Sequence, residues 1–139
     1  TYAGLSYQTQ KYVGPVSVFV LPNPTKLKEC IEEIKNQINL WDKDEYYTDE
    51  QLQTAKDILK RNYIRQNEKP SVLPHQLTYA WCSTSYAYYT DYNSNCEKVT
   101  RTDIKNYIDK YIKGKNYVAG IIINEQMNKQ IKTSEFFKP

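Results

Sequence analysis

A helical repeat of apolar residues after residue 24 is the pattern that most restricts the fold. Apolar side chains recur there at spacings of four, three, four and three. They are Leu27, Ile31, Ile34, Ile38 and Trp41. These spacings place all of them on one face of an α-helix, so the segment is predicted to be an amphipathic helix with one buried stripe. Asn23 is its predicted N-cap and Pro24 its predicted first residue.

The segments before and after the helical part of the chain have strand character. Residues 4–13 alternate between apolar and polar side chains, and residues 16–21 form a second apolar run after the turn signal Gly14-Pro15. Two such runs joined by a short turn predict an antiparallel hairpin. Residues 117–123 are apolar and β-branched, which predicts one more strand.

Two more helices are predicted in the middle of the chain. Thr48 and Gln51 have the spacing of a capping box, and the apolar pattern that follows them ends at Pro70. A further helix is predicted from about Val72. Its end is not defined by the sequence, because residues 83–92 are rich in hydroxyl, β-branched and aromatic side chains.

A last helix is predicted from residue 100. Residues 93–98 are turn-like, Thr100 and Asp103 mark a helix start, and Gly114 fits the C-cap position. The predicted order is two strands, several helices and one strand. This order predicts an α+β fold, with a mostly antiparallel sheet and helices packed on one face.

The size and charge of the chain restrict its function class. Its 139 residues fit a single domain, and a net charge of +3 from mixed basic and acidic residues argues against a nucleic-acid interface. No apolar run is long enough to span a membrane. The chain begins at Thr1 within a strand-like pattern, which suggests an N-terminally truncated piece of a longer protein. The 14 tyrosines fill cores or border interfaces, and they leave glycan binding open as an alternative.

The residues that usually carry catalysis are sparse. His75 is the single histidine in the sequence, so neither H-E-x-x-H nor H-x-x-E-H occurs. Cys30, Cys82 and Cys96 are odd in number and lack C-x-x-C spacing. Three free, mostly buried thiols are the preferred interpretation, and a pair between Cys82 and Cys96 stays open. The sequence predicts no catalytic residue and no metal ligand on this chain.

Three segments, in this order, resemble the C-terminal domains of insulinase-like (pitrilysin-like) zinc peptidases. The run GLSY at residues 4–7, followed by the apolar run at 16–21, is similar to a Gly-Leu-Ala-Tyr strand and its successor. The run TDEQLQTAK at 48–56 is similar to a Thr-x-Glu-Glu-Leu-x-x-Ala-Lys helix start. The run VTRTDI at 99–104 is similar to the helix before the last strand.

The resemblance implies a truncated, non-catalytic domain that binds a peptide substrate and closes a chamber opposite a zinc-bearing domain. Zinc is then expected on that partner domain, held by H-x-x-E-H, either in the same polypeptide or in a partner subunit. The family's substrate-holding Tyr corresponds to Tyr7, which makes Tyr7 the predicted substrate-binding residue. The Arg that accompanies it falls before Thr1. A periplasmic or envelope location is implied by the resemblance alone.

The resemblance leaves alternatives open. Residues 71–96 match the family only in their helical character. Some relatives have lost proteolysis and serve as core proteins of respiratory complexes, so a structural subunit is one alternative. A tyrosine-rich module that binds glycans is another, and an ordinary strand tyrosine is the alternative for Tyr7.

Overall fold

The computed structural model describes residues 2–130, and it is mostly helical. Its elements are β1 (Tyr2–Tyr7), β2 (Val16–Leu21), a 3-10 turn (Pro24–Lys26), α1 (Leu27–Leu40), a second 3-10 turn (Asp44–Tyr46), α2 (Asp49–Asn67), α3 (Leu73–Ser83), α4 (Tyr86–Lys98), α5 (Arg101–Tyr111) and α6 (Glu125–Gln130). The predicted α+β fold with a mostly antiparallel sheet is therefore wrong. The sheet within the described residues is the two-stranded hairpin of β1 and β2.

The hairpin forms as predicted, with a shorter first strand. β1 and β2 are antiparallel, and their register pairs Tyr2 with Leu21 and Tyr7 with Val16. The first strand ends at Tyr7 and not at residue 13, so residues 8–15 form the connection. The two ends of this connection approach closely at Gly14: a Cβ there would clash with the backbone carbonyl oxygen of Gln8 and would lie 3.1 Å from Cε2 of the Tyr7 ring. This close approach explains why glycine occupies the position.

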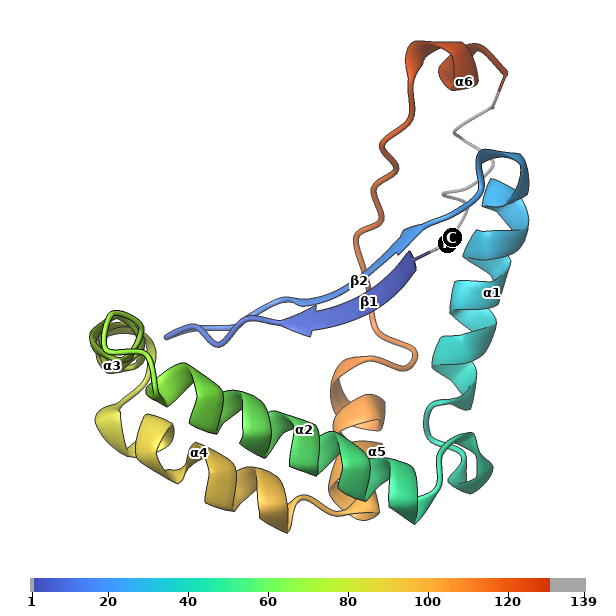
Figure 1. Cartoon of the computed structure of the whole chain (residues 1–139). Coiled ribbons are helices and arrows are strands. Elements are labelled where there is room, and N and C mark those ends of the chain that lie inside the picture. The colour runs from blue at the N-terminus through green and yellow to red at the C-terminus, as the bar shows by residue number, and fades with distance from the viewer. Residues whose placement is uncertain (1, 131–139) are drawn as a thin grey trace.

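Residues 117–123, which were predicted to be a strand, adopt no regular structure. Val118 and Ile122 are fully exposed, and a Cβ at Gly120 would meet nothing. Figure 1 shows this segment running away from the helices between α5 and α6. A strand needs hydrogen-bond partners in a neighbouring strand, and β1 and β2 pair with each other. The strand propensity of residues 117–123 was not enough to make them a strand, because strand propensity mainly reflects how well a side chain fits a packed sheet.

The predicted helix caps are present. The side chain of Asn23 accepts a hydrogen bond from the backbone N–H of Thr25, although the first turn is 3-10 and α1 follows it. Thr48 and Gln51 form a complete capping box, with hydrogen bonds of 3.1 and 2.8 Å. The same reciprocal arrangement occurs at the start of α5. Gly114 has a positive φ of 67°, the backbone conformation expected after a helix.

Replacing Thr48 with alanine is expected to lower the free energy of unfolding by about 1 kcal/mol, because it removes the N-cap acceptor of α2. Urea denaturation followed by circular dichroism measures the change. Thr54→Ala is the matched control, since Thr54 lies inside the same helix and is exposed. Equal losses from both variants would contradict a specific role for the cap.

Helix α4 was not predicted from the sequence. Its N-cap is Ser85, whose hydroxyl accepts a hydrogen bond from the backbone N–H of Tyr88. Tyr89, Tyr92 and Cys96 are half-buried at spacings of three and four, and α4 packs against α2 and α3. The helical spacing of these three side chains is the sequence signal from which the helix could have been predicted. The many Tyr, Thr and Asn residues, which favour helices weakly, concealed it.

The elements enclose little core. Among the side chains that the structure describes, Ala80 and Ile108 are buried, with 6% and 5% of their surfaces exposed. The chain exposes 11239 Å², whereas a compact monomer of this mass exposes about 7,500 Å². In Figure 1, α2 and α4 lie side by side, the hairpin extends above them, and α1 stands at one end. This open arrangement leaves large apolar side chains uncovered.

Ion pairs attach α5 to the connection between α1 and α2. Arg101 Nε lies 2.5 Å from Asp49 Oδ1, and its Nη2 donates to the carbonyl of Tyr47 over 2.6 Å. The guanidinium also stacks over the Tyr47 ring, 4.4 Å from its centroid. Lys113 pairs with Asp42 at 2.6 Å just beyond the helix. Ion pairs therefore help to hold α5 against the rest of the chain, a role that a larger apolar core would otherwise fill.

The pair of Asp42 with Lys113 predicts a loss of stability in acid. The hydrogen bond from Lys113 lowers the pKa of Asp42 below its ordinary 3.8. A carboxyl whose folded pKa is depressed stabilises the fold above its unfolded pKa, and that contribution disappears as the pH falls through the folded pKa. The urea midpoint is therefore expected to drop as the pH is lowered below about 4. Asp42→Asn should flatten this dependence, whereas Asp109→Asn, on the exposed side of α5, should leave it unchanged.

Candidate functional site

Tyr7, the predicted substrate-binding residue, lies at the end of β1 with 53% of its surface exposed. Its ring packs on Gly14, in the connection that leads to β2. It also lies near Tyr107 of α5: burial raises the pKa of Tyr107, and the neighbouring Tyr7 and Tyr111 raise it further. Tyr7 thus contacts the hairpin connection while about half of its surface stays exposed. The position of Tyr7 does not test its predicted substrate-binding role, which stays a prediction.

The three cysteines lie on three different helices, and the histidine shares α3 with Cys82. His75 is in α3, and the three cysteines are in α1, α3 and α4. All three cysteines are free, so Cys82 and Cys96 are not paired, and none of them is fully buried. Within residues 2–130 no group of three or more His, Cys, Asp or Glu side chains is placed to hold a metal ion.

A pocket of about 330 Å³ lies between α2, α3, α4 and the hairpin connection. We call it the tyrosine pocket. Its aromatic lining consists of Tyr63, Tyr79, Tyr88, Tyr89 and Tyr92. Its amide lining consists of Asn62, Gln66 and Gln76, and hydroxyl groups come from Thr9, Ser83 and Thr84. Leu59 and Ala80 complete the described wall, and all of these lining residues are uncharged.

Hydrogen bonds between distant segments hold the tyrosine pocket together. The Tyr79 hydroxyl donates to the carbonyl of Thr9 over 2.5 Å, and Thr9 Oγ1 lies 3.2 Å from the Tyr88 hydroxyl. The Tyr89 hydroxyl donates to Asn67 at the end of α2. These contacts join the hairpin connection to α3 and α4, and α4 to α2. The sequence analysis missed this site because the residues that hydrogen bonds join in it are up to 79 positions apart in the chain.

Burial raises the pKa of two phenol groups that line the pocket. It is the main cause that raises the pKa of Tyr89, and the main cause that raises the pKa of Tyr92, whose hydroxyl also lies beside Cys96. A phenol with a pKa above its ordinary 10.0 stays protonated at neutral pH. The pocket therefore offers hydroxyl groups and aromatic faces without charge.

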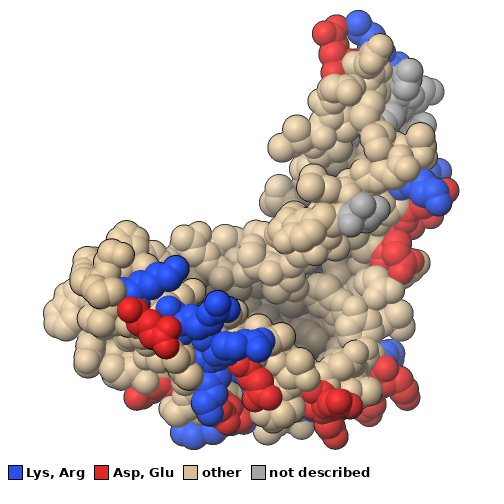
Figure 2. All heavy atoms as spheres, viewed as in Figure 1, with Lys and Arg blue, Asp and Glu red and all other residues tan. Residues whose placement is uncertain are grey.

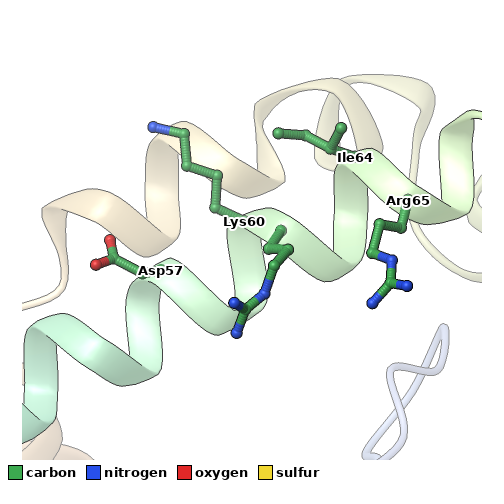
Figure 3. Close-up of a pocket in the computed structure, with 5 residues that line it drawn as sticks. Asp57, Lys60, Ile64 and Arg65 are labelled. Atoms are coloured by element: carbon green, nitrogen blue, oxygen red, sulfur yellow. The ribbon is translucent and has the colours of Figure 1, made fainter.

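A shallow basic pocket lies on the outer side of α2. Figure 3 shows Lys60 and Arg65 leaving the helix on opposite sides, with Asp57 one turn before Lys60. Lys60 pairs with Glu97 of α4 at 3.0 Å, which raises the pKa of Lys60. In Figure 2 the blue side chains over α2 lie next to red ones, while most of the face above them is uncharged. This mixture is typical of a solvated helix surface.

Comparisons with known proteins give no relative. No protein-family model matches the sequence, and neither a curated protein nor a solved structure is significantly similar to the chain. Within the described residues, no helix is both long enough and apolar enough to cross a membrane.

Proposed function

We propose that this chain acts non-covalently, as the non-catalytic part of an insulinase-like zinc peptidase. In that role it docks on a zinc-bearing domain and helps to close the chamber in which a peptide is cleaved. The zinc-bearing domain belongs to the same polypeptide or to a partner subunit. The metal, the activated water and the chemistry of hydrolysis reside on that domain, and this chain contributes surface and substrate contacts.

The uncovered apolar surface of the hairpin is the observation that carries the proposal. Phe19 and Leu21 are exposed on one face of the hairpin and Leu5 on the opposite face, although such side chains usually lie in a core. The outer edges of β1 and β2 have no ladder partner within the described residues. Exposed edges and contiguous apolar surface favour pairing with another polypeptide. The surface in excess of a compact monomer is several times the ~800 Å² per partner of a standard interface.

The three segments that resemble the peptidase family add support of unequal weight. The run at residues 4–7 lies on β1, within the uncovered hairpin. The runs at 48–56 and 99–104 begin α2 and α5, where Thr48 and Thr100 form capping boxes. Capping explains these two runs without any peptidase role. The first run, which contains Tyr7, therefore carries most of the weight of the resemblance.

Reconstitution with the zinc-bearing domain tests the proposal. That domain would be sought by its H-x-x-E-H motif upstream in the same reading frame or in the neighbouring gene. Mixing it with this chain is expected to give a complex by light scattering, and faster cleavage of a quenched fluorescent peptide than the zinc-bearing domain achieves alone. Equal cleavage with and without the chain would contradict the proposal, as would the absence of H-x-x-E-H from both places.

Leu5→Glu is expected to abolish this complex, because it places a charge in the centre of the hairpin face that Leu5 shares with Val18. Ile58→Glu is the matched control, since Ile58 has a similar apolar side chain, is 41% exposed and lies on α2. Light scattering and cleavage rates are measured for both variants. Retention of the complex by Leu5→Glu would show that this face of the hairpin is not the docking surface.

A further inference from the structure

The tyrosine pocket combines aromatic faces with amide groups and excludes charge. A quarter of the residues in the chain are charged, yet no charged residue is among the described residues that line this pocket. Its volume of about 330 Å³ lies at the lower end of the 300–1,000 Å³ that is usual for small-molecule sites. A ligand for this pocket must therefore be small, neutral and both apolar and polar.

We propose that the tyrosine pocket binds a neutral sugar ring of an oligosaccharide. The C–H groups on one face of a pyranose are apolar and pack on an aromatic ring, while its hydroxyls donate and accept hydrogen bonds. The five tyrosines supply the aromatic faces, and Asn62, Gln66 and Gln76 supply amide groups. A nucleotide fits less well, because no lining cation is present to contact a phosphate. An acidic sugar also fits less well, because its carboxylate would meet no cation among the described lining residues.

The amides at the pocket keep hydrogen-bonding capacity for a ligand. Gln76 Nε2 donates to Gln66 Oε1 over 3.3 Å. Each primary amide has two donor hydrogens and an oxygen with two lone pairs. The Gln76–Gln66 bond uses one donor and one lone pair, so the other donors and acceptors of the two amides remain available to sugar hydroxyls. Asn62, one turn before Gln66 on α2, is exposed at the pocket.

The wall of the pocket is organised before any ligand binds. Tyr79 and Tyr88 are held by hydrogen bonds to Thr9, and Tyr89 is held by Asn67. The rings of Tyr63 and Tyr89 pack 5.5 Å apart, and those of Tyr88 and Tyr92 pack edge to face. A wall that is already ordered loses little conformational entropy on binding. The proposal of a sugar-binding site is independent of the proposed peptidase function, so either can hold without the other.

Isothermal titration calorimetry with the whole chain tests the proposal. The probes are maltohexaose, cellohexaose, xylohexaose and chitohexaose, with an oligogalacturonate and oligothymidylate as charged comparisons. At least one neutral hexasaccharide is expected to bind with a Kd of about 1 mM or tighter. No measurable binding to any of the four neutral probes would overturn the proposal, and so would preferential binding of oligothymidylate or the oligogalacturonate at this pocket.

Two substitutions, with one control, test whether the sugar binds in the tyrosine pocket. Tyr88→Ala is expected to weaken binding of the best hexasaccharide at least tenfold, whereas Tyr86→Ala should leave it unchanged, because Tyr86 lies on the same helix but outside the pocket. Asn62→Ala should weaken binding several-fold, and as an exposed helix position it should not disturb the fold. Unchanged affinity in Asn62→Ala and in a folded Tyr88→Ala would overturn the assignment.

Discussion

Replacing Tyr7 with phenylalanine in the assembled peptidase is expected to lower kcat about 10²-fold, with little change in KM. Under the proposed function, the Tyr7 phenol donates a hydrogen bond to the scissile carbonyl as negative charge develops on its oxygen. An interaction made mainly in the transition state affects kcat, whereas one made equally with the bound substrate affects KM. The ring packs on Gly14 in either variant, so the fold should be retained.

Tyr12→Phe is the matched control for Tyr7→Phe. Tyr12 lies in the connection between β1 and β2, is 81% exposed, and is five residues from Tyr7. Steady-state cleavage of a fluorescent peptide by the reconstituted assembly supplies kcat and KM for both variants. An unchanged kcat for Tyr7→Phe, in an assembly that does cleave peptide, would identify Tyr7 as an ordinary strand tyrosine and reject its hydrogen bond to the scissile carbonyl.

Replacing Ile108 with alanine is expected to lower the free energy of unfolding by about 2–4 kcal/mol. Ile108 is one of two buried apolar side chains among those the structure describes, and it lies on α5. Its truncation removes buried methyl groups and leaves a cavity. Small domains have about 5–15 kcal/mol of total stability, so the loss would be a large fraction of it. Urea denaturation followed by circular dichroism measures the change.

Ile122→Ala is the control for Ile108→Ala. Ile122 has the same side chain but is fully exposed within the irregular segment 117–123. Its truncation is expected to change stability by less than about 0.5 kcal/mol. Comparable losses in the two variants would mean that residues 117–123 are packed in solution, in contrast to the structure.

The hairpin and the main helix boundaries followed from local sequence. Thr48 with Gln51, and Thr100 with Asp103, specify helix starts because each cap joins residues three positions apart. The pair of apolar runs around Gly14-Pro15 specified a hairpin for the same reason, since its strands are neighbours in the chain. These elements depend on contacts that lie within a few residues or across one turn.

Tertiary structure decided the rest. Residues 117–123 have the composition of a strand, yet a strand requires a hydrogen-bonding neighbour from elsewhere, and none is formed in the described chain. Helix α4 has weak local signals and is supported by packing on α2 and α3. The tyrosine pocket joins Thr9 to tyrosines 70 and 79 residues away. Local pattern cannot specify such contacts, because they depend on which distant surfaces the folded chain brings together.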